Sequence, residues 1–233
     1  MEVRPVIDLK DGVVVHARMG MRSAYAPIET PLSPTSRPND VARGLLSIFP
    51  FKTFYVADLD AIENKGNNNA ALRQLSAEYP NLVFWVDAGI ADIHDGERWL
   101  EAGFGHLVIG SETQRNSELV NHLCRNERTI LSLDFRGDAF LGPVSLLNDA
   151  NTWPAKIIVM ALAHIGSARG PDMDRLTAIK SRVVNRQIYG AGGVRDANDL
   201  ALLARAGIAG ALVATSLHDG RLTGAQIARL SGL

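Results

Sequence analysis

Two stretches in the last quarter of the chain decide the fold: Gln187-Ile-Tyr-Gly-Ala-Gly-Gly-Val-Arg-Asp196 and Gly210-Ala-Leu-Val-Ala-Thr-Ser-Leu-His218. In each, a short apolar run leads into small residues and then into the start of a helix, which predicts a strand, a tight turn and a helix. Turns of this kind leave backbone N–H groups free to face an anion. The sequence therefore predicts a phosphate site formed by Gly192, Gly193, Ala214 and Thr215.

The segment between these stretches has the pattern of an amphipathic helix. From Asp196 to Ala206, apolar residues recur at the spacing of one buried helical face, at Leu200, Leu203 and Ala204. Gly207 follows at the position where a helix end favours a residue with positive φ. Strand, glycine turn, helix and strand in this order predict a βαβ unit, which almost always joins parallel strands.

The same unit occurs a second time in the first half of the chain. Residues 87–111 align without a gap with residues 191–215, and the offset is 104 residues at positions 88 and 192, 103 and 207, and 111 and 215. Chance similarity between two βαβ units is the alternative explanation. The constant register favours two related halves, each with a small-residue turn suited to a phosphate.

Eight short apolar runs along the chain have the composition of strands, and amphipathic segments separate them. The runs span residues 3–7, 53–57, 82–86, 106–109, 129–133, 156–161, 188–189 and 211–213. A length of 233 residues fits one α/β barrel better than two ordinary domains. We therefore expect one domain over residues 1–233, of the α/β class, folded as a (β/α)8 TIM barrel with an internal half-barrel repeat.

The composition limits the classes of partner. The 24 Lys and Arg residues balance 25 Asp and Glu residues, so neither a nucleic-acid nor a membrane surface is indicated. Cys124 is the single cysteine, which excludes an internal disulfide and fits a reducing compartment. The sequence shows no secretory leader pattern and no apolar run of membrane-spanning length. We expect a cytoplasmic protein whose partner is a small molecule.

Two acidic residues stand at the ends of expected strands that face each other across the barrel. Asp8 ends the first strand and Asp134 ends the fifth, and the carboxyl ends of barrel strands carry the chemistry. Two carboxylates on opposite sides of one mouth suit a reaction in which one donates a proton and the other removes one, such as sugar isomerisation. Asp8 could equally cap a loop by accepting backbone N–H groups.

Other polar residues near the strand ends are candidates for ligand binding. Arg18 and Arg22 accompany a long first loop with four prolines, where they could reach a phosphate or remain solvated. Asp58 shares one face of an extended strand with Asp60, and paired carboxylates could bind a metal, hold a lysine or orient hydroxyl groups. No His or Cys cluster accompanies them, so we expect no metal. Three further candidates follow the first, third and sixth strands: Lys10, Asp87 and Ser167.

Four motifs carry a resemblance to a known family. They are Val6-Ile-Asp-Leu-Lys-Asp-Gly-Val-Val-Val15, Ala57-Asp-Leu-Asp-Ala-Ile62, Leu131-Ser-Leu-Asp-Phe-Arg-Gly137 and Gly190-Ala-Gly-Gly-Val194. With them the chain resembles, over nearly its whole length, the barrel family of histidine biosynthesis. That family contains the isomerase that performs an Amadori rearrangement on a ribotide aminoimidazole carboxamide, and the cyclase subunit of imidazole glycerol phosphate synthase.

The resemblance implies roles for particular residues. In that family the acids at the ends of strands one and five are the general acid and base, which correspond to Asp8 and Asp134. No cofactor is implied, and the oligomeric state is left open. The family's phosphate loops correspond to Gly192, Gly193, Ala214 and Thr215, and to Gly89, Gly110 and Ser111.

The chain departs from the family pattern at two places. The glycine triplet after the third strand is here Asp87-Ala88-Gly89, which places a negative charge beside the second phosphate position. The acidic residue that the isomerase carries after strand six is replaced around His164-Ile165. The resulting pattern is similar to a divergent subgroup of the family found in archaea and methylotrophic bacteria. A ligand with one phosphate or with two is compatible with it.

Three functions fit these motifs. The first is an isomerase of a phosphorylated, sugar-type substrate that uses Asp8 and Asp134 as acid and base. The second is a lyase or synthase of one-carbon, pterin-type cofactor metabolism, in which Lys10 forms an imine with a carbonyl substrate, although a loop lysine is commonly just solvated. The third is a non-catalytic barrel that binds a phosphorylated metabolite, because a fold does not fix a function.

Overall fold

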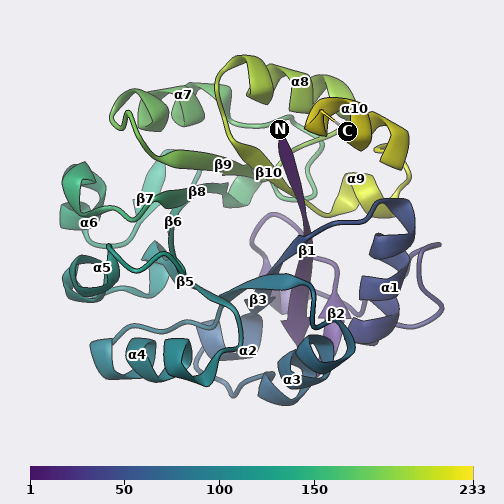
Figure 1. The fold of residues 1–233 in the computed structure, drawn as a ribbon, viewed down its shortest axis with the longest axis horizontal. Helices are drawn as coiled ribbons and strands as arrows, with labels where there is room; N and C mark the ends of the chain where they lie inside the picture. The colour runs from purple at the N-terminus through teal and green to yellow at the C-terminus, as the bar shows by residue number, and fades with distance from the viewer. Residues whose placement is uncertain (233) are drawn as a thin grey trace.

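Eight parallel strands form a closed barrel in the computed structural model, which describes residues 1–232 (Figure 1). The last strand pairs with the first, with Glu2 opposite Gly210 and Pro5 opposite Val213, so the parallel sheet has no free edge. This confirms the predicted (β/α)8 barrel. The strands are β1 (Glu2–Lys10), β3 (Thr53–Asp58), β4 (Val83–Asp87), β5 (His106–Gly110), β6 (Thr129–Arg136), β8 (Lys156–Ala161), β9 (Gln187–Ala191) and β10 (Gly210–Val213).

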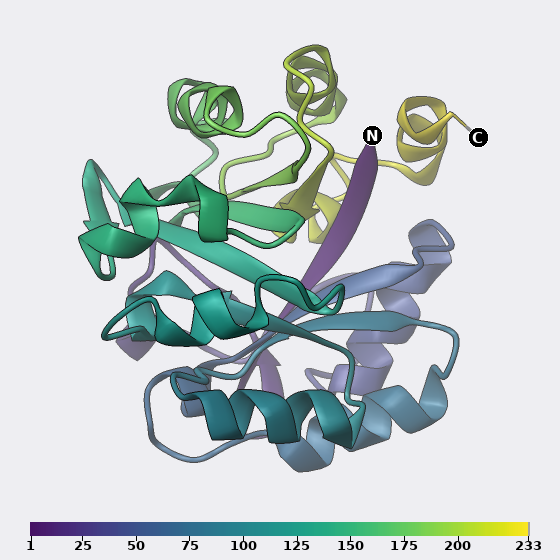
Figure 2. The ribbon, with the colours of Figure 1, turned by 60° about the vertical axis from the view of Figure 1, so that its left-hand side comes forward.

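Helices surround the barrel and cover its outer surface (Figures 1 and 2). The longer ones are α1 (Pro38–Ile48), α3 (Asn69–Glu78), α4 (Ile93–Ala102), α5 (Glu118–Leu123), α7 (Met173–Ser181), α8 (Ala197–Arg205) and α10 (Gly224–Ser231). Short turns of helix are α2 (Leu59–Ile62), α6 (Val144–Asn148), α9 (Thr215–His218), η1 (Arg22–Ala24), η2 (Ser111–Thr113), η3 (Ala150–Thr152) and η4 (Leu162–His164). None of the helices within residues 1–232 is long and apolar enough to cross a membrane.

Alternation along the strands divides the apolar side chains into two cores. On β3, Phe54 is buried among side chains of the helical layer, whereas its neighbour Tyr55 belongs to the cluster that fills the barrel. Trp85 and Ile130 lie in the same interior cluster. Because successive side chains of a strand point to opposite faces, this period of two places every second residue inside the barrel.

Two antiparallel hairpins extend the barrel at opposite positions. β2 (Val13–Val15) folds back on β1 and places Val15 opposite Asp8, while β7 (Ala139–Leu141) folds back on β6 and places Leu141 opposite Asp134. Both turns contain a glycine with positive φ, 80° at Gly12 and 59° at Gly137. Asp8 and Asp134 thus occupy equivalent positions on two hairpins.

The half-barrel repeat predicted from the sequence is present in the structure. β4 begins and ends 104 residues before β9, at 83 and 187 and at 87 and 191. The following helices, α4 and α8, are capped by Asp92 and Asp196, whose side chains each accept backbone N–H groups of the first turn. They are followed by Gly103 and Gly207, both with a φ of 72°. The two units therefore share their local geometry as well as their register.

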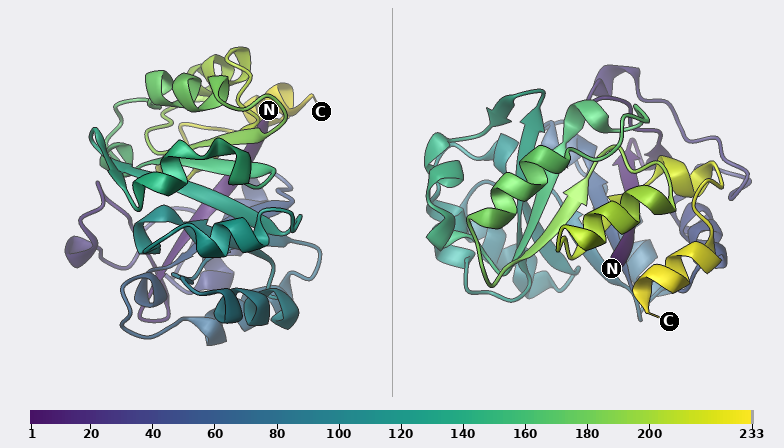
Figure 3. Two further views of the ribbon diagram at one scale, coloured as in Figure 1. Left: turned by 90° about the vertical axis from the view of Figure 1, so that its left-hand side faces the viewer. Right: turned by 90° about the horizontal axis from the view of Figure 1, so that it is seen from above.

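The barrel is plugged at the amino-terminal ends of its strands. The guanidinium of Arg4 lies 3.7 Å from the ring centroid of Trp85 and 4.7 Å from that of Tyr189, and Arg4 is only 7% exposed. The strand arrowheads point toward the opposite end, where the first loop lies, and the N-terminus marks the plugged end (Figure 3, right). A ligand is therefore expected at the carboxyl ends of the strands.

The cap of α8 provides a test of the repeat geometry. The Asp196 carboxylate accepts the backbone N–H groups of Asn198 and Asp199 at 2.8 and 3.2 Å. Asp196→Ala should lower the free energy of unfolding by about 1 kcal/mol, because both donors lose their partner. In a chain of this size the thermal midpoint should fall by roughly 2–4 °C in calorimetry. Asp196→Asn, which keeps the capping oxygen, is the control, and an equal loss in both variants would contradict this role of the cap.

Candidate active site

Three aspartates from barrel strands meet in one cavity at the mouth of the barrel. Asp8, Asp87 and Asp134 line this cavity, which we call the central cavity, from β1, β4 and β6. They face the mouth because alternate residues of a barrel strand point inward. Tyr55 and Glu112 line the same cavity, and neither residue was predicted from the sequence. The structure thus brings the two predicted acid–base residues and Asp87 together.

Asp134 is held by hydrogen bonds from three donors. Its carboxylate accepts from the Ser132 hydroxyl at 2.6 Å, and from the Ser111 hydroxyl and the Glu112 backbone N–H at 3.1 Å each. Burial raises the pKa of Asp134 to about 6, the Ser132 hydrogen bond opposes this rise, and the negative charge of Glu112 adds to it. Asp134 is consequently the acid of the cavity that is best stabilised in its ionised form.

Asp8 has a different environment. Its carboxyl group accepts no hydrogen bond from the described residues 1–232. Burial raises the pKa of Asp8 to about 7, and the positive charge of Arg22 opposes the rise. Near neutral pH, Asp8 therefore exchanges a proton more readily than an ordinary carboxyl group.

Asp87 lies against the same glycine as Asp134. A Cβ atom on Gly110 would be 2.8 Å from Oδ2 of Asp87 and 3.5 Å from Oδ2 of Asp134, so a side chain at this position would push into both carboxyl groups. Burial and the neighbouring charge of Asp134 raise the pKa of Asp87 to about 8, and the backbone N–H of Gly89 and the positive charge of Arg22 oppose this rise. Gly110 is thus required by the packing of two acids against it.

The first loop is fixed over the cavity by Arg22. The Arg22 guanidinium forms an ion pair with Glu112 on η2, and the side chain of Lys10 donates to the Arg22 carbonyl oxygen at 3.1 Å. Lys10 itself lines neither mouth cavity. The contacts join the β2–α1 loop to the turn after β5, on the other side of the opening.

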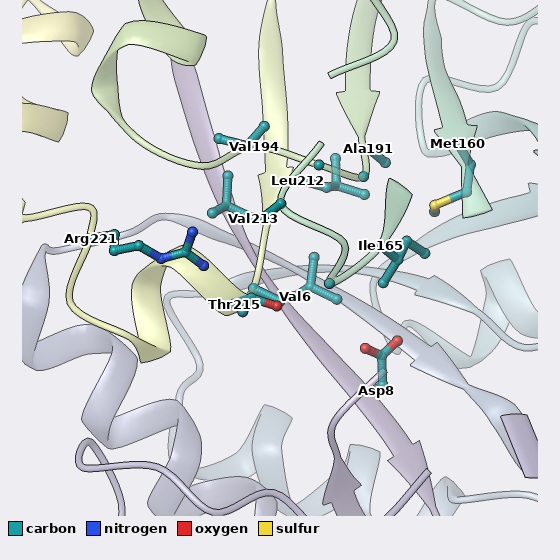
Figure 4. Close-up of a pocket in the computed structure, with 15 residues that line it drawn as sticks. Val6, Asp8, Met160, Ile165, Ala191, Val194, Leu212, Val213, Thr215 and Arg221 are labelled. Carbon is teal, nitrogen blue, oxygen red and sulfur yellow. The ribbon is translucent and has the colours of Figure 1, made fainter. Parts of the chain in front are cut away.

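A second cavity adjoins the first through Asp8 and contains the predicted phosphate turns. We call it the phosphate-turn cavity, and Figure 4 shows it with Thr215 and Arg221 at one end and Asp8 at the other. Gly193 has a φ of 88°, and its backbone N–H has no acceptor within residues 1–232. A Cβ atom there would collide with the carbonyl oxygen of Gly170. Gly192, Gly193, Ala214 and Thr215 all line this cavity, as does Arg221.

Arg221 was not identified from the sequence. It lies in the loop after α9, and its guanidinium bonds Asp219 at 2.9 Å while facing the phosphate-turn cavity. A cation a few residues after a small-residue turn was the only indication in the sequence. A guanidinium there adds a charged donor to the backbone N–H groups of the turn.

The corresponding turn of the other half-barrel is arranged differently. Gly89, Gly110 and Ser111 line neither mouth cavity. The backbone N–H of Gly89 donates to Asp87 at 3.1 Å, and the Ser111 hydroxyl and the Glu112 N–H donate to Asp134. Carboxylates of the protein therefore occupy three donors near the position predicted for the second phosphate.

The remaining predicted residues lie outside both cavities. Asp58 is fully buried and accepts the backbone N–H and the side-chain amide of Asn68, both at 2.7 Å, and the N–H of Ala61 at 3.1 Å. Ser167 donates to the His164 carbonyl oxygen at 2.9 Å, and Arg18 is exposed. Within residues 1–232, no group of three or more His, Cys, Asp or Glu side chains is arranged to hold a metal ion.

Comparison with known proteins identifies the family. The chain matches the model of the family described as histidine biosynthesis protein over residues 2–223, and it belongs to this family. The predicted resemblance is confirmed.

Three relatives illustrate the range of the similarity. The chain is 28% identical over 229 residues, 95% of each chain, to an uncharacterized protein of Methanocaldococcus jannaschii. It is 31% identical over 182 residues, 72% of this chain and 76% of the relative, to the 1-(5-phosphoribosyl)-5-((5-phosphoribosylamino)methylideneamino) imidazole-4-carboxamide isomerase of Deinococcus radiodurans. The isomerase of the same name from Azotobacter vinelandii is 27% identical over 244 residues, 97% of this chain and 96% of the relative.

The contacts of Asp58 yield a prediction that separates it from the acids of the central cavity. Asp58→Ala should lower the free energy of unfolding by about 3 kcal/mol, because it leaves buried donors of Ala61 and Asn68 without an acceptor. Chemical denaturation would measure the loss. Glu63→Ala, at the end of the same short helix α2, is the control and should change the stability by less than about 0.5 kcal/mol. An Asp58→Ala protein as stable as the control would show that these contacts contribute little.

Proposed function

We propose that the chain is an isomerase that acts on a phosphorylated, sugar-type small molecule by general acid–base catalysis. One observation carries the proposal: Asp8 and Asp134, from the first and fifth parallel strands, line one cavity, and Asp8 also lines the phosphate-turn cavity. A phosphate held at Gly193 and Arg221 would anchor the ligand so that its adjoining atoms reach Asp8. Anchoring of this kind positions a substrate between catalytic groups.

The environments of the two acids suggest their roles. Three donors favour the carboxylate form of Asp134, which suits a group that removes a proton. Asp8 has no such donors and a higher pKa, about 7, which suits a group that donates one. Two acids whose environments push their pKa values apart can divide the work of an isomerisation.

The relatives support the reaction type. Two of them carry the name of an isomerase, and their named compound contains two phosphoribosyl groups. We propose the same class of reaction for this chain, in a cytoplasmic setting, with a phosphorylated small molecule as its only required partner.

The acid pair can be tested by substitution. Asp8→Asn and Asp134→Asn should each lower turnover by at least about a hundredfold, because each removes one proton-transfer group. A thermal-shift screen of phosphorylated metabolites, with the relatives' named compound included, would first identify a ligand, since ligands that bind only the folded state raise the thermal midpoint. Turnover of that ligand is then measured in the wild type and in the variants.

Asp138→Asn is the matched control for these variants, because Asp138 is an exposed acid on the turn between β6 and β7 and lines neither mouth cavity. It should retain full turnover. Full activity in both Asp8→Asn and Asp134→Asn would rule out the acid pair. A ligand that binds tightly and is never converted would instead support a barrel that only binds its metabolite.

The pKa values also predict the shape of the pH profile. Below about 6 Asp134 becomes protonated and can no longer remove a proton, and above about 7 Asp8 becomes ionised and can no longer donate one. The kcat/KM should therefore be bell-shaped, with its maximum between these two values. A kcat/KM that stays constant from about pH 5 to about pH 9 would contradict the assignment.

The phosphate anchor is best tested at Arg221, because Gly193→Glu would also strain the contact with Gly170. Arg221→Gln should weaken binding of a phosphorylated ligand by about tenfold, since it removes a charge-assisted hydrogen bond. Binding of the dephosphorylated analogue should not change. Arg18→Gln is the control, as Arg18 is exposed and lines neither cavity. Equal losses for the phosphorylated and dephosphorylated ligands would place the phosphate elsewhere.

A further inference from the structure

The central cavity carries an excess of acidic groups. Its lining includes four carboxyl groups, those of Asp8, Asp87, Glu112 and Asp134, and two guanidinium groups, those of Arg22 and Arg136. Arg22 is already paired with Glu112, and Arg136 is exposed at the rim. The charge of Arg22 also acts on Asp87, and within residues 1–232 no cation other than these two arginines lines the cavity.

Two polar atoms of buried residues in this cavity have no hydrogen-bond partner within residues 1–232. Tyr55 is 4% exposed, and its hydroxyl has no hydrogen-bond partner within residues 1–232. Asp87 is 5% exposed, and only its Oδ1 has a partner, the backbone N–H of Gly89. Buried polar atoms in proteins are nearly always bonded. The hydroxyl of Tyr55 and Oδ2 of Asp87 are thus available for a ligand that enters the cavity.

A second phosphate is disfavoured at this end. Three donors of the turns after β4 and β5, the Gly89 N–H, the Ser111 hydroxyl and the Glu112 N–H, already bond Asp87 and Asp134 and are not free for an anion. It would also meet the negative charge of Asp134. A neutral hydroxyl would avoid the repulsion, but it would give the carboxyl groups, which outnumber the guanidinium groups of the cavity, no charged partner.

We propose that the ligand has a single phosphate, bound in the phosphate-turn cavity, and at its other end a protonated nitrogen group, bound between Asp87, Glu112 and Asp134 with the Tyr55 hydroxyl as a further acceptor. The inference rests on the proposed function for the phosphate anchor alone. A cation at this place forms charge-assisted hydrogen bonds and relieves the repulsion among the carboxylates. The substrate class is therefore an amino or amidino compound with one phosphate.

Matched probes that differ only at one end test this assignment. They are 4-aminobutyl phosphate, 4-hydroxybutyl phosphate and butane-1,4-diyl bisphosphate, with longer and shorter members of each series. Isothermal titration calorimetry on the full chain near neutral pH measures their affinities. The aminoalkyl phosphate should bind at least about tenfold more tightly than the hydroxyalkyl phosphate of equal length, and the bisphosphate should bind more weakly than both.

Variants of the acids show where the nitrogen group binds. Asp87→Asn and Glu112→Gln should each remove most of the preference for the amine, while the hydroxyalkyl phosphate keeps its affinity and so reports that the variant is folded. Asp138→Asn, which removes an acid at the rim outside both cavities, should keep the full preference.

The outcomes separate this inference from the proposed function. Equal affinity for amine and hydroxyl, or tighter binding of the bisphosphate, would overturn the inference and leave the phosphate anchor in place. An amine preference that survives in Asp87→Asn and in Glu112→Gln would overturn it as well. If no phosphorylated probe binds, the phosphate anchor itself fails, and the inference fails with it.

Discussion

The pairing of β10 with β1 is the constraint on which the remaining structure depends. Hydrogen bonding between these strands closes the sheet, so the carboxyl ends of all eight parallel strands surround one opening. Residues separated by more than a hundred positions, such as Asp8 and Asp134, are thereby placed around the same cavity. An eight-stranded barrel has an interior just wide enough for side chains, and here residues such as Trp85 and Tyr189 fill it.

The electrostatics of the mouth follow from this geometry. Side chains at the strand ends lose water because the first loop and the interior core enclose them, and burial is the main cause of the raised pKa values of Asp8, Asp87 and Asp134. The hydrogen bonds differ among the three acids, and this difference distinguishes their chemistry. In one half of the mouth the N–H of Gly193 is free, whereas in the other half the N–H groups of Gly89 and Glu112 bond the acids Asp87 and Asp134. A symmetric repeat has thus acquired an asymmetric charge distribution.

The sequence predicted the fold better than it predicted the site. Apolar runs located all eight strands. The ends of the repeated helix, marked by Asp196 and Gly207, were also readable from the sequence, because caps and glycine turns depend on adjacent residues only. The Arg22–Glu112 ion pair joins residues 90 positions apart and could not be inferred from spacing. The Asp58 carboxylate bonds Asn68, and this contact likewise depends on how the loop after β3 packs. Such contacts are set by the three-dimensional path of the loops, which periodicity does not encode.

The stack of Arg4 on Trp85 and Tyr189 closes the barrel at the amino-terminal ends of its strands. A ligand that enters at the mouth cannot leave at the opposite end, so it enters and leaves through the same opening. The ion pair between Arg22 and Glu112 joins the two sides of that opening. Substrate and product therefore use the same opening, and a product that has not yet left blocks the next substrate.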